Sequence, residues 1–123
     1  MVTIMRFKVL TYGTPEYYQA VSLRENILRK PLGQVFSPQE LEAESAHIHM
    51  GGYDNSRLLA TAVLVPEGDV YKMQRVAVLP DFQGQGIGGE LLKFCEAYVK
   101  DRGGKYIYCH ARDSAVSFYE KNH

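Results

Sequence analysis

The 123-residue sequence contains no tryptophan and only two cysteines. Cys95 and Cys109 form no CxxC motif and are too few for a disulfide framework, so we expect two packed thiols. His47 and His49 share one face of an expected strand, but a zinc site needs two further ligands that the sequence does not offer. We therefore expect neither a disulfide-stabilised fold nor a metal centre.

An excess of charge of either sign is also missing, because 14 lysines and arginines balance 14 aspartates and glutamates. No basic stripe indicates nucleic-acid binding, and no cationic amphipathic segment indicates a lipid surface. The longest apolar stretches, such as residues 58–65, are too short to span a membrane, and Arg6 and Lys8 interrupt any signal-peptide core. Since 46% hydrophobic and 23% charged residues are typical of globular domains, we expect one cytoplasmic domain over residues 1–123.

Helix and strand signals alternate along the chain. Thr14-Pro15-Glu16 is typical of a helix start, and residues 37–40 (Ser-Pro-Gln-Glu) have the pattern of a capping box. We predict helices over residues 14–28, 37–45, 86–102 and 114–122, the last capped by Asp113, and strands over residues 6–12, 47–53, 57–65, 70–79 and 105–111.

The predicted order β-α-α-β-β-β-α-β-α describes a mixed α/β sheet. The short turns after residues 53 and 65 require antiparallel neighbours, whereas helix 86–102 makes a right-handed crossover between two parallel strands. Ligands bind to such sheets where a parallel pair parts at its carboxyl ends. We therefore expect a ligand crevice between the strands over residues 70–79 and 105–111.

Glycine is concentrated at the start of the third predicted helix. Gly84, Gly86, Gly88 and Gly89 remove side chains from a first turn whose backbone N–H groups lack intrahelical partners and carry partial positive charge. Each glycine weakens a helix by about 1 kcal/mol relative to alanine, which favours a ligand-binding role over a simple packing turn. We predict that a phosphate or pyrophosphate binds here.

The residues around these glycines narrow the kind of phosphate ligand. The segment lacks GxxxxGK[ST], so it is not a nucleoside-triphosphate loop. Gly84-x-Gly86-x-x-Gly89 matches the dinucleotide fingerprint by letter, but residues 80–83 separate it from the strand and the chain offers a single crossover. A dinucleotide-binding oxidoreductase is therefore a secondary hypothesis.

Two segments together resemble the GNAT superfamily of N-acetyltransferases. Gln83-x-x-Gly86-x-Gly88, after a strand ending in residues 76–80 (Val-Ala-Val-Leu-Pro), is similar to the family's acetyl-CoA motif, and residues 115–122 (AVSFYEKN) resemble its second motif, A-x-x-F-Y-x-K. The resemblance implies that the loop amides hold the pyrophosphate of acetyl-CoA, that the strand backbone holds the pantetheine and thioester, and that Tyr119 lies near the sulfur. The implied binding residues are Val76, Ala77, Val78, Gln83, Gly84, Gln85, Gly86, Ile87, Gly88, Gly89 and Tyr119.

The implied reaction is direct transfer of the acetyl group of acetyl-CoA to an amine. The amine must attack as a neutral nucleophile, since a lysine-type ammonium has a pKa of about 10.4. Backbone donors of a strand whose ladder is broken suit the oxyanion, and Tyr119 is the expected general acid for the CoA thiolate, with core packing as its alternative role. Candidates for the base, by residue type only, are Glu40, Glu42, Glu44, His47, His49 and Asp69.

Several alternatives stay open at this point. Glu40 and Glu44 lie one helical turn apart, which is more typical of a solvated helix face than of a catalytic pair. A covalent route through Cys109 is disfavoured because a thiol buried in a strand forms little thiolate. The acceptor is open among polyamines, amino acids, antibiotics and protein amines, and a non-catalytic CoA-binding or regulatory module is the main alternative function.

The C-terminal part departs from the family pattern in two ways. Arg112 stands where the second motif often carries an asparagine that contacts the pantetheine. The two closing strands that normally follow this motif are absent from a sequence that ends at His123. We therefore expect a bare sheet edge from Lys105 to Ala111, which invites self-association or a covering tail from a longer chain.

Overall fold

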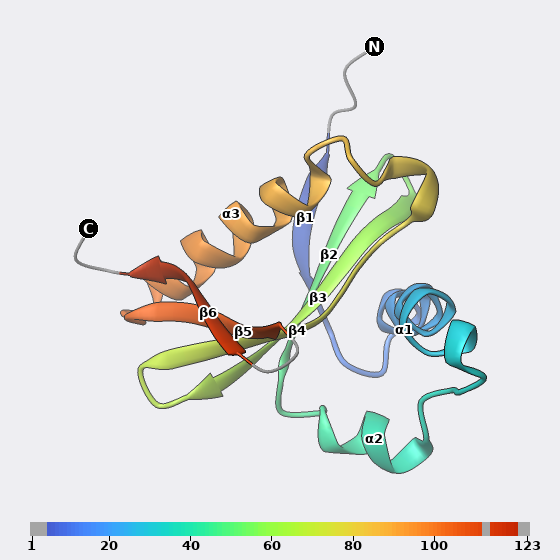
Figure 1. Cartoon of the computed structure of the whole chain (residues 1–123), viewed down its shortest axis with the longest axis horizontal. Coiled ribbons are helices and arrows are strands. Elements are labelled where there is room, and N and C mark those ends of the chain that lie inside the picture. Colours follow the sequence, from blue (N-terminus) through green and yellow to red (C-terminus); the bar gives the residue numbers. More distant parts are fainter. Residues whose placement is uncertain (1–4, 112–113, 121–123) are drawn as a thin grey trace.

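The computed structural model describes residues 5–111 and 114–120. Its elements, labelled in Figure 1, are β1 (Arg6–Leu10), α1 (Pro15–Leu28), the 3-10 turn η1 (Lys30–Leu32), α2 (Pro38–Ala43), β2 (Ile48–Asp54), β3 (Arg57–Glu67), β4 (Val70–Val78), the 3-10 turn η2 (Pro80–Phe82), α3 (Ile87–Asp101), β5 (Tyr106–Ala111) and β6 (Ser114–Glu120). The predicted mixed α/β fold is confirmed, and the element bounds up to β5 lie within a few residues of those predicted.

The six strands form one sheet in the order β1-β2-β3-β4-β5-β6. Among the strands that the structure describes, only β4 and β5 are parallel, and α3 makes the crossover between them. The other neighbouring pairs are antiparallel, as the short turns require. In Figure 1, α3 lies on one side of the sheet, and α1 and α2 lie on the other.

Both N-terminal helices begin as their sequences predict. The Thr14 side chain accepts a hydrogen bond from the Tyr17 N–H (3.3 Å) at the start of α1. Ser37 and Glu40 form a reciprocal capping box at α2, each side chain accepting a bond of 3.1 Å from the other residue's N–H. These caps fix the residue at which each helix begins.

The main core lies between the sheet and the apolar stripe of α3. Leu91, Cys95 and Val99 of α3 are fully buried against Met50, Leu64 and other apolar side chains of the sheet. The helix ends at Asp101, and Gly103, just beyond the C-cap Arg102, has a φ of 74°. A Cβ atom at Gly104 would lie 2.4 Å from Val99 Cγ1, so only glycine fits between the end of α3 and the sheet.

The final element differs from the sequence prediction. Residues 114–120 form β6 and not a helix, and they pair antiparallel with β5 from Ala111↔Ser114 to Tyr106↔Glu120. Val116, Phe118 and Tyr119 favour strands, and a helix of this length is marginal on its own, whereas the free side of β5 offers a row of backbone partners. Arg112, Asp113 and Asn122 lie outside the described residues.

The predicted bare edge from Lys105 to Ala111 is consequently wrong. The side of β5 that faces away from β4 is paired with β6 of the same chain. Self-association through this edge loses its structural basis, because its backbone groups already have partners.

Candidate functional site

The first part of the site is the loop that leads into α3. Gly84 and Gly86 both have left-handed backbone angles, with φ of 82° and 81°, and Gly86 is the N-cap of the helix. The first intrahelical bond runs from the Glu90 N–H to the Gly86 carbonyl (3.1 Å), and within the described part of the chain no side chain caps the helix. The N–H groups of residues 87–89 therefore have no acceptor inside α3.

Open space surrounds this first turn. A Cβ atom placed on Gly88 or Gly89 would meet no atom within 4 Å, and both residues are exposed. Ile87, in contrast, is buried in the core and anchors the turn. Bare amides, the positive end of the helix dipole and free volume are the features that a phosphate or pyrophosphate requires.

The two glutamines of the loop bond to the loop itself. The Gln83 amide donates to the Val78 carbonyl at the end of β4 (2.9 Å), and the Gln85 amide donates to the Asp81 carbonyl (3.3 Å). These bonds tie the glycine turn to the end of the strand. Both side chains are exposed, so their contribution in this structure is to hold the loop.

The second part of the site is a β-bulge in β4. The pairing with β3 shifts by one residue between Thr61 and Val63, so that Arg75 and Val76 together face Ala62. Arg75 has a left-handed φ of 52°, which few residues other than glycine adopt. A bulge leaves backbone groups of one residue outside the ladder. The expectation of a broken ladder in this strand is confirmed.

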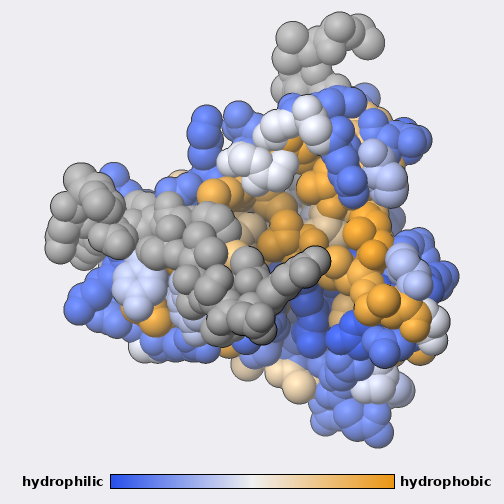
Figure 2. Space-filling model, viewed as in Figure 1, coloured by the Kyte–Doolittle hydropathy of each residue, from blue (hydrophilic) through white to orange (hydrophobic). Residues whose placement is uncertain are grey.

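A cleft connects the loop to the bulge. β4 and β5 pair only through Val70, Tyr71 and Lys72, and the two strands separate beyond that point. The cleft has a volume of about 360 Å³ and is lined by Met73, Val76, Gly88, Gly89, Leu92 and Cys109. Figure 2 shows hydrophobic residues gathered on this face, beside α3 and over β3 and β4. The predicted crevice between the parallel strands is therefore present, and its walls are apolar.

The predicted strand residues have different surroundings. Val76 is exposed and lines the cleft. Val78 packs against the core beside α3, while Ala77 is buried and pairs with Thr61. Of the three side chains, only that of Val76 reaches the cleft, so any contribution of the other two residues comes from their backbone.

Tyr119 lies on β6, where its backbone pairs with Ile107. Ile107 in turn pairs with Tyr71, near the start of β4, whereas the bulge is four residues further along the strand. The backbone of Tyr119 is therefore not beside the bulge, and its side chain lies outside the described part of the structure. Its role as general acid stays a prediction from the motif.

The two cysteines differ in their surroundings. Cys95 is fully buried in α3, and burial raises the pKa of its thiol to about 12, so it is an inert packed thiol. Cys109 is half-buried and lines the cleft.

Two of the carboxylates proposed as bases, Glu40 and Glu44, belong to an ionic cluster on the other side of the sheet. Glu44, at the end of α2, is fully buried, so the expectation of a solvated helix face is wrong for this residue. Its Oε1 accepts hydrogen bonds from the Tyr17 hydroxyl (2.6 Å) and from Arg24, and its Oε2 accepts one from Arg75. Cations or a phenol engage both oxygens of Glu44, and Glu44 does not line the cleft.

Glu40 belongs to the edge of the same cluster. Its two oxygens accept a bidentate pair of hydrogen bonds from Arg29, at 3.1 and 2.6 Å, and Arg75 lies 3.9 Å away. The hydrogen bonds from Arg29 lower the pKa of Glu40 to about 2. A carboxylate with such a low pKa is a weak base.

The other base candidates are scattered. Burial lowers the pKa of both His47 and His49, and the His49 ring bonds to the Glu44 carbonyl (2.9 Å). Asp69 is exposed and forms an ion pair of 3.0 Å with Lys105. Glu42 is exposed on α2. The structure brings none of these four residues to the cleft.

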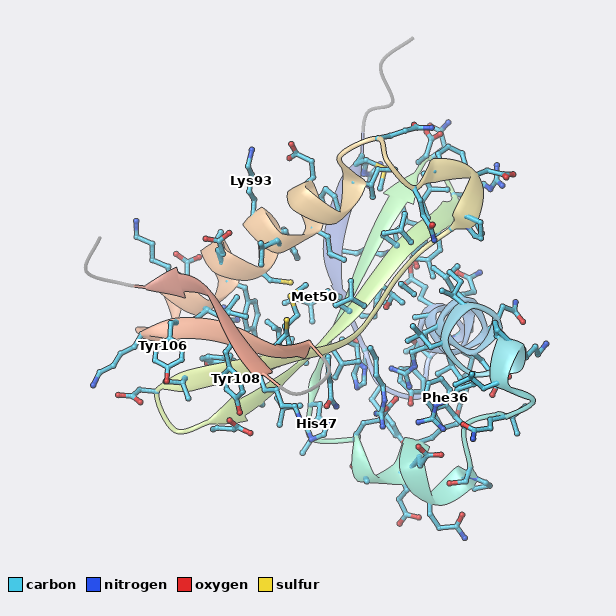
Figure 3. The ribbon with its side chains drawn as sticks, in the orientation of Figure 1. Phe36, His47, Met50, Lys93, Tyr106 and Tyr108 are labelled. Carbon is cyan, nitrogen blue, oxygen red and sulfur yellow. The ribbon has the colours of Figure 1, made fainter. Side chains whose placement is uncertain are left out.

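Sequence reasoning missed the residues that complete the cluster. Tyr17 and Arg24 come from α1, Phe36 from the segment before α2, and Arg75 from the bulge. The guanidinium groups of Arg24, Arg29 and Arg75 lie 4.8, 4.2 and 5.2 Å from the ring centroid of Phe36, which Figure 3 shows between α1 and α2. No local motif connects these positions, so the sequence carried no signal for them.

The described residues contain neither a cluster of metal ligands nor a helix that could span a membrane. Within residues 5–111 and 114–120, no group of three or more His, Cys, Asp or Glu side chains is placed to hold a metal ion. In the same part of the chain, no helix combines the length and the apolar character that a membrane span needs.

Comparisons with known proteins agree with this geometry. YjcF of Bacillus subtilis, an uncharacterized N-acetyltransferase, is 31% identical over 83 residues, which cover 68% of this chain and 58% of YjcF. The structure of Escherichia coli ElaA matches with a TM-score of 0.73 at 18% identity, covering 89% of this chain and 80% of ElaA.

A further structure, of a GNAT family acetyltransferase from Elizabethkingia anophelis with acetyl-CoA bound, matches with a TM-score of 0.66 at 22% identity. It covers 89% of this chain and 67% of that protein. The sequence profile of the Acetyltransferase (GNAT) family matches residues 14–123. The matched region contains the bulge of β4, the parallel pair that separates and the glycine-rich start of α3. The chain therefore belongs to the GNAT family of N-acetyltransferases.

Proposed function

We propose that this protein transfers the acetyl group of acetyl-CoA to the nitrogen of an amine by direct attack. The observation that carries the proposal is the continuity of the cleft. Gly88 and Gly89, at the anion-binding start of α3, line the same apolar space as Val76, at the bulge of β4. One elongated ligand with a phosphate end and an acyl end can therefore use both.

The parts of acetyl-CoA fit the parts of the site. The amides of residues 87–89 suit the pyrophosphate, since a phosphate at Gly88 or Gly89 meets no side chain. The apolar walls suit the pantetheine arm, and the bulge offers backbone donors to the thioester carbonyl. The E. anophelis acetyltransferase, which shares the fold, was determined with acetyl-CoA bound.

The chemistry needs a neutral amine, a stabilised oxyanion and a proton for the departing thiolate. Glu40 and Glu44 are held in ion pairs, so we infer that the amine loses its proton to water and not to a carboxylate of the cluster. Backbone donors at the bulge stabilise the oxyanion. The general acid of the proposal is Tyr119 of the second motif.

Calorimetric titration with acetyl-CoA, CoA and NADH tests the binding half of the proposal. We expect acetyl-CoA and CoA to bind and NADH not to bind, because the described strands contain one β-α-β crossover and not the paired units of a dinucleotide fold. Release of CoA thiol with a panel of polyamines, amino acids, aminoglycosides and peptide N-termini tests the catalytic half. Binding of NADH alone would overturn the assignment.

A non-catalytic CoA-binding module is the second candidate, and one observation favours it. The backbone of Tyr119, the proposed general acid, pairs with Ile107 and not with a residue beside the bulge. This candidate predicts tight binding of acetyl-CoA without thiol release from any amine in the panel.

A further inference from the structure

Arg75 is held in an unfavourable backbone conformation at the centre of the site. Its φ of 52° lies in the left-handed region, where residues with a Cβ atom are strained. Such strain persists only where the surrounding structure imposes it. The contacts of the Arg75 side chain show what imposes it here.

The Arg75 guanidinium is bound on the side of the sheet opposite the cleft. It donates to Oε2 of Glu44, lies 3.9 Å from Glu40 and stacks 5.2 Å from the Phe36 ring centroid. Glu44 cannot yield, because its side chain is fully buried, Arg24 and Tyr17 bind its other oxygen, and His49 contacts its backbone carbonyl. One carboxylate thus ties together α1, α2 and β4.

The direction of these contacts requires the bulge. In a regular strand, Arg75 would point to the same face as Tyr71 and Met73, toward α3. The extra residue turns Arg75 toward Glu44 instead, and it places Val76 in the cleft together with Met73, three positions away. The ion pair and the shape of the cleft wall are therefore two consequences of one backbone conformation.

We propose that Arg24, Glu44 and Arg75 act as a positioning unit that locks the β4 bulge and so aims its backbone donors at the thioester carbonyl. This proposal rests on the proposed function, since it assigns a purpose to the bulge within acetyl-CoA chemistry. None of the three side chains lines the cleft, so none touches the acyl group. They act through the backbone of residues 75–76.

The test compares Arg75→Ala with Arg75→Gly. Both remove the guanidinium, but glycine adopts a positive φ without strain and alanine does not. The readout is the carbonyl stretching frequency of bound [1-¹³C]acetyl-CoA, which falls when a backbone donor polarises the thioester. It needs no knowledge of the acceptor. Affinity for acetyl-CoA is measured in parallel by calorimetry.

We expect the wild-type protein to lower the frequency relative to free acetyl-CoA. Arg75→Ala loses most of this shift at an affinity within about threefold of wild type, and Arg75→Gly recovers it in large part. With an acceptor identified, kcat of Arg75→Ala falls by about 10²-fold, the scale of one lost oxyanion donor, while KM changes little. A folded Arg75→Ala variant with the full wild-type shift would overturn the proposal.

Two controls separate the possible failures. Glu44→Gln should reproduce the loss seen in Arg75→Ala. Glu40→Gln should retain the shift, because the charge that it removes lies 3.9 Å from Arg75 and its main partner is Arg29. If Glu44→Gln fails to fold, the comparison of Arg75→Ala with Arg75→Gly still tests the proposal. If the wild-type protein binds no acetyl-CoA, the proposed function fails and takes this inference with it. If the wild-type protein binds acetyl-CoA but the carbonyl frequency shift does not depend on residue 75, the inference is refuted and the proposed function stands.

Discussion

The start of α3 and the junction of α1, α2 and β4 lie on opposite sides of one bulged strand and are built from different groups. The first uses backbone amides, exposed glycines and open space. The second uses charged side chains that are removed from water, with Arg24 and Glu44 at its centre. In our proposals, backbone groups on one side of the strand bind the ligand, and ion pairs on the other side keep the strand rigid.

This division follows from what each task needs. A site for a mobile phosphate must be reachable by the ligand, and bare amides at a helix start are reachable without being reactive. A backbone held at positive φ must be restrained at all times, and buried charges with fixed partners restrain it because leaving them unpaired is expensive. The predictions below separate the two tasks.

The largest effect is expected at the buried carboxylate. Glu44→Ala leaves two guanidinium groups without their shared partner, one of them fully buried, and should lower the free energy of unfolding by about 3–5 kcal/mol. Denaturant titration measures it. Glu42→Ala, on the exposed face of the same helix, is the matched control and should stay within about 0.5 kcal/mol of wild type. Equal effects of the two substitutions would show that the cluster carries no special stability.

The second prediction concerns the glycine turn. Gly88→Val should lower acetyl-CoA affinity by about 100-fold or more, because the branched side chain would fill the phosphate position and remove hydrogen bonds of about 1.5–3 kcal/mol each. Stability should change little, since a Cβ atom there meets nothing. Gly86→Val is a less clean variant, because its φ of 81° adds backbone strain.

Lys93→Val controls for the β-branched residue in this experiment. Lys93 lies on α3 and points away from the sheet in Figure 3, so the substitution tests helix propensity without touching the cleft. It should leave the affinity for acetyl-CoA unchanged. An unchanged affinity in folded Gly88→Val protein would remove the loop from the binding site.

The same division explains how far the sequence could predict this protein. Helix caps, glycine turns and the β-α-β crossover are local patterns in the sequence. They are sufficient to predict the loop at residues 83–89 and the crevice beside β4. Only the tertiary fold brings together Tyr17, Arg24, Glu44 and Arg75. From the sequence alone, Glu44 is expected on a solvated helix face, whereas it is buried. The sequence predicts a helix over residues 114–122, where residues 114–120 form a strand, because local propensity takes no account of the free edge of a neighbouring strand.

The third prediction concerns Tyr119 of the second motif, which is the proposed general acid in a site otherwise built from backbone groups. If Tyr119 protonates the departing thiolate, Tyr119→Phe should lower kcat by about 10²-fold with little change in acetyl-CoA affinity. Tyr108→Phe is the matched control, because Tyr108 lies on neighbouring β5 and its hydroxyl donates to Glu67. Full activity of Tyr119→Phe would make Tyr119 a packing residue.

The smallest effect is expected at Glu40, which lies at the partly exposed edge of the ionic cluster. Hydrogen bonds from Arg29 lower the folded-state pKa of Glu40 from 4.5 to about 2. A carboxyl whose pKa is lower in the folded state stabilises the fold above its unfolded pKa, and this contribution disappears as the pH falls from about 4.5 toward 2. Glu40→Gln should therefore reduce stability slightly at neutral pH and flatten part of the acid limb of the unfolding curve. Thermal unfolding of both proteins between pH 2 and 7 measures this, with Glu42→Gln as the exposed control. Parallel curves for wild type and Glu40→Gln over that range would show that the Arg29–Glu40 pair adds nothing to stability.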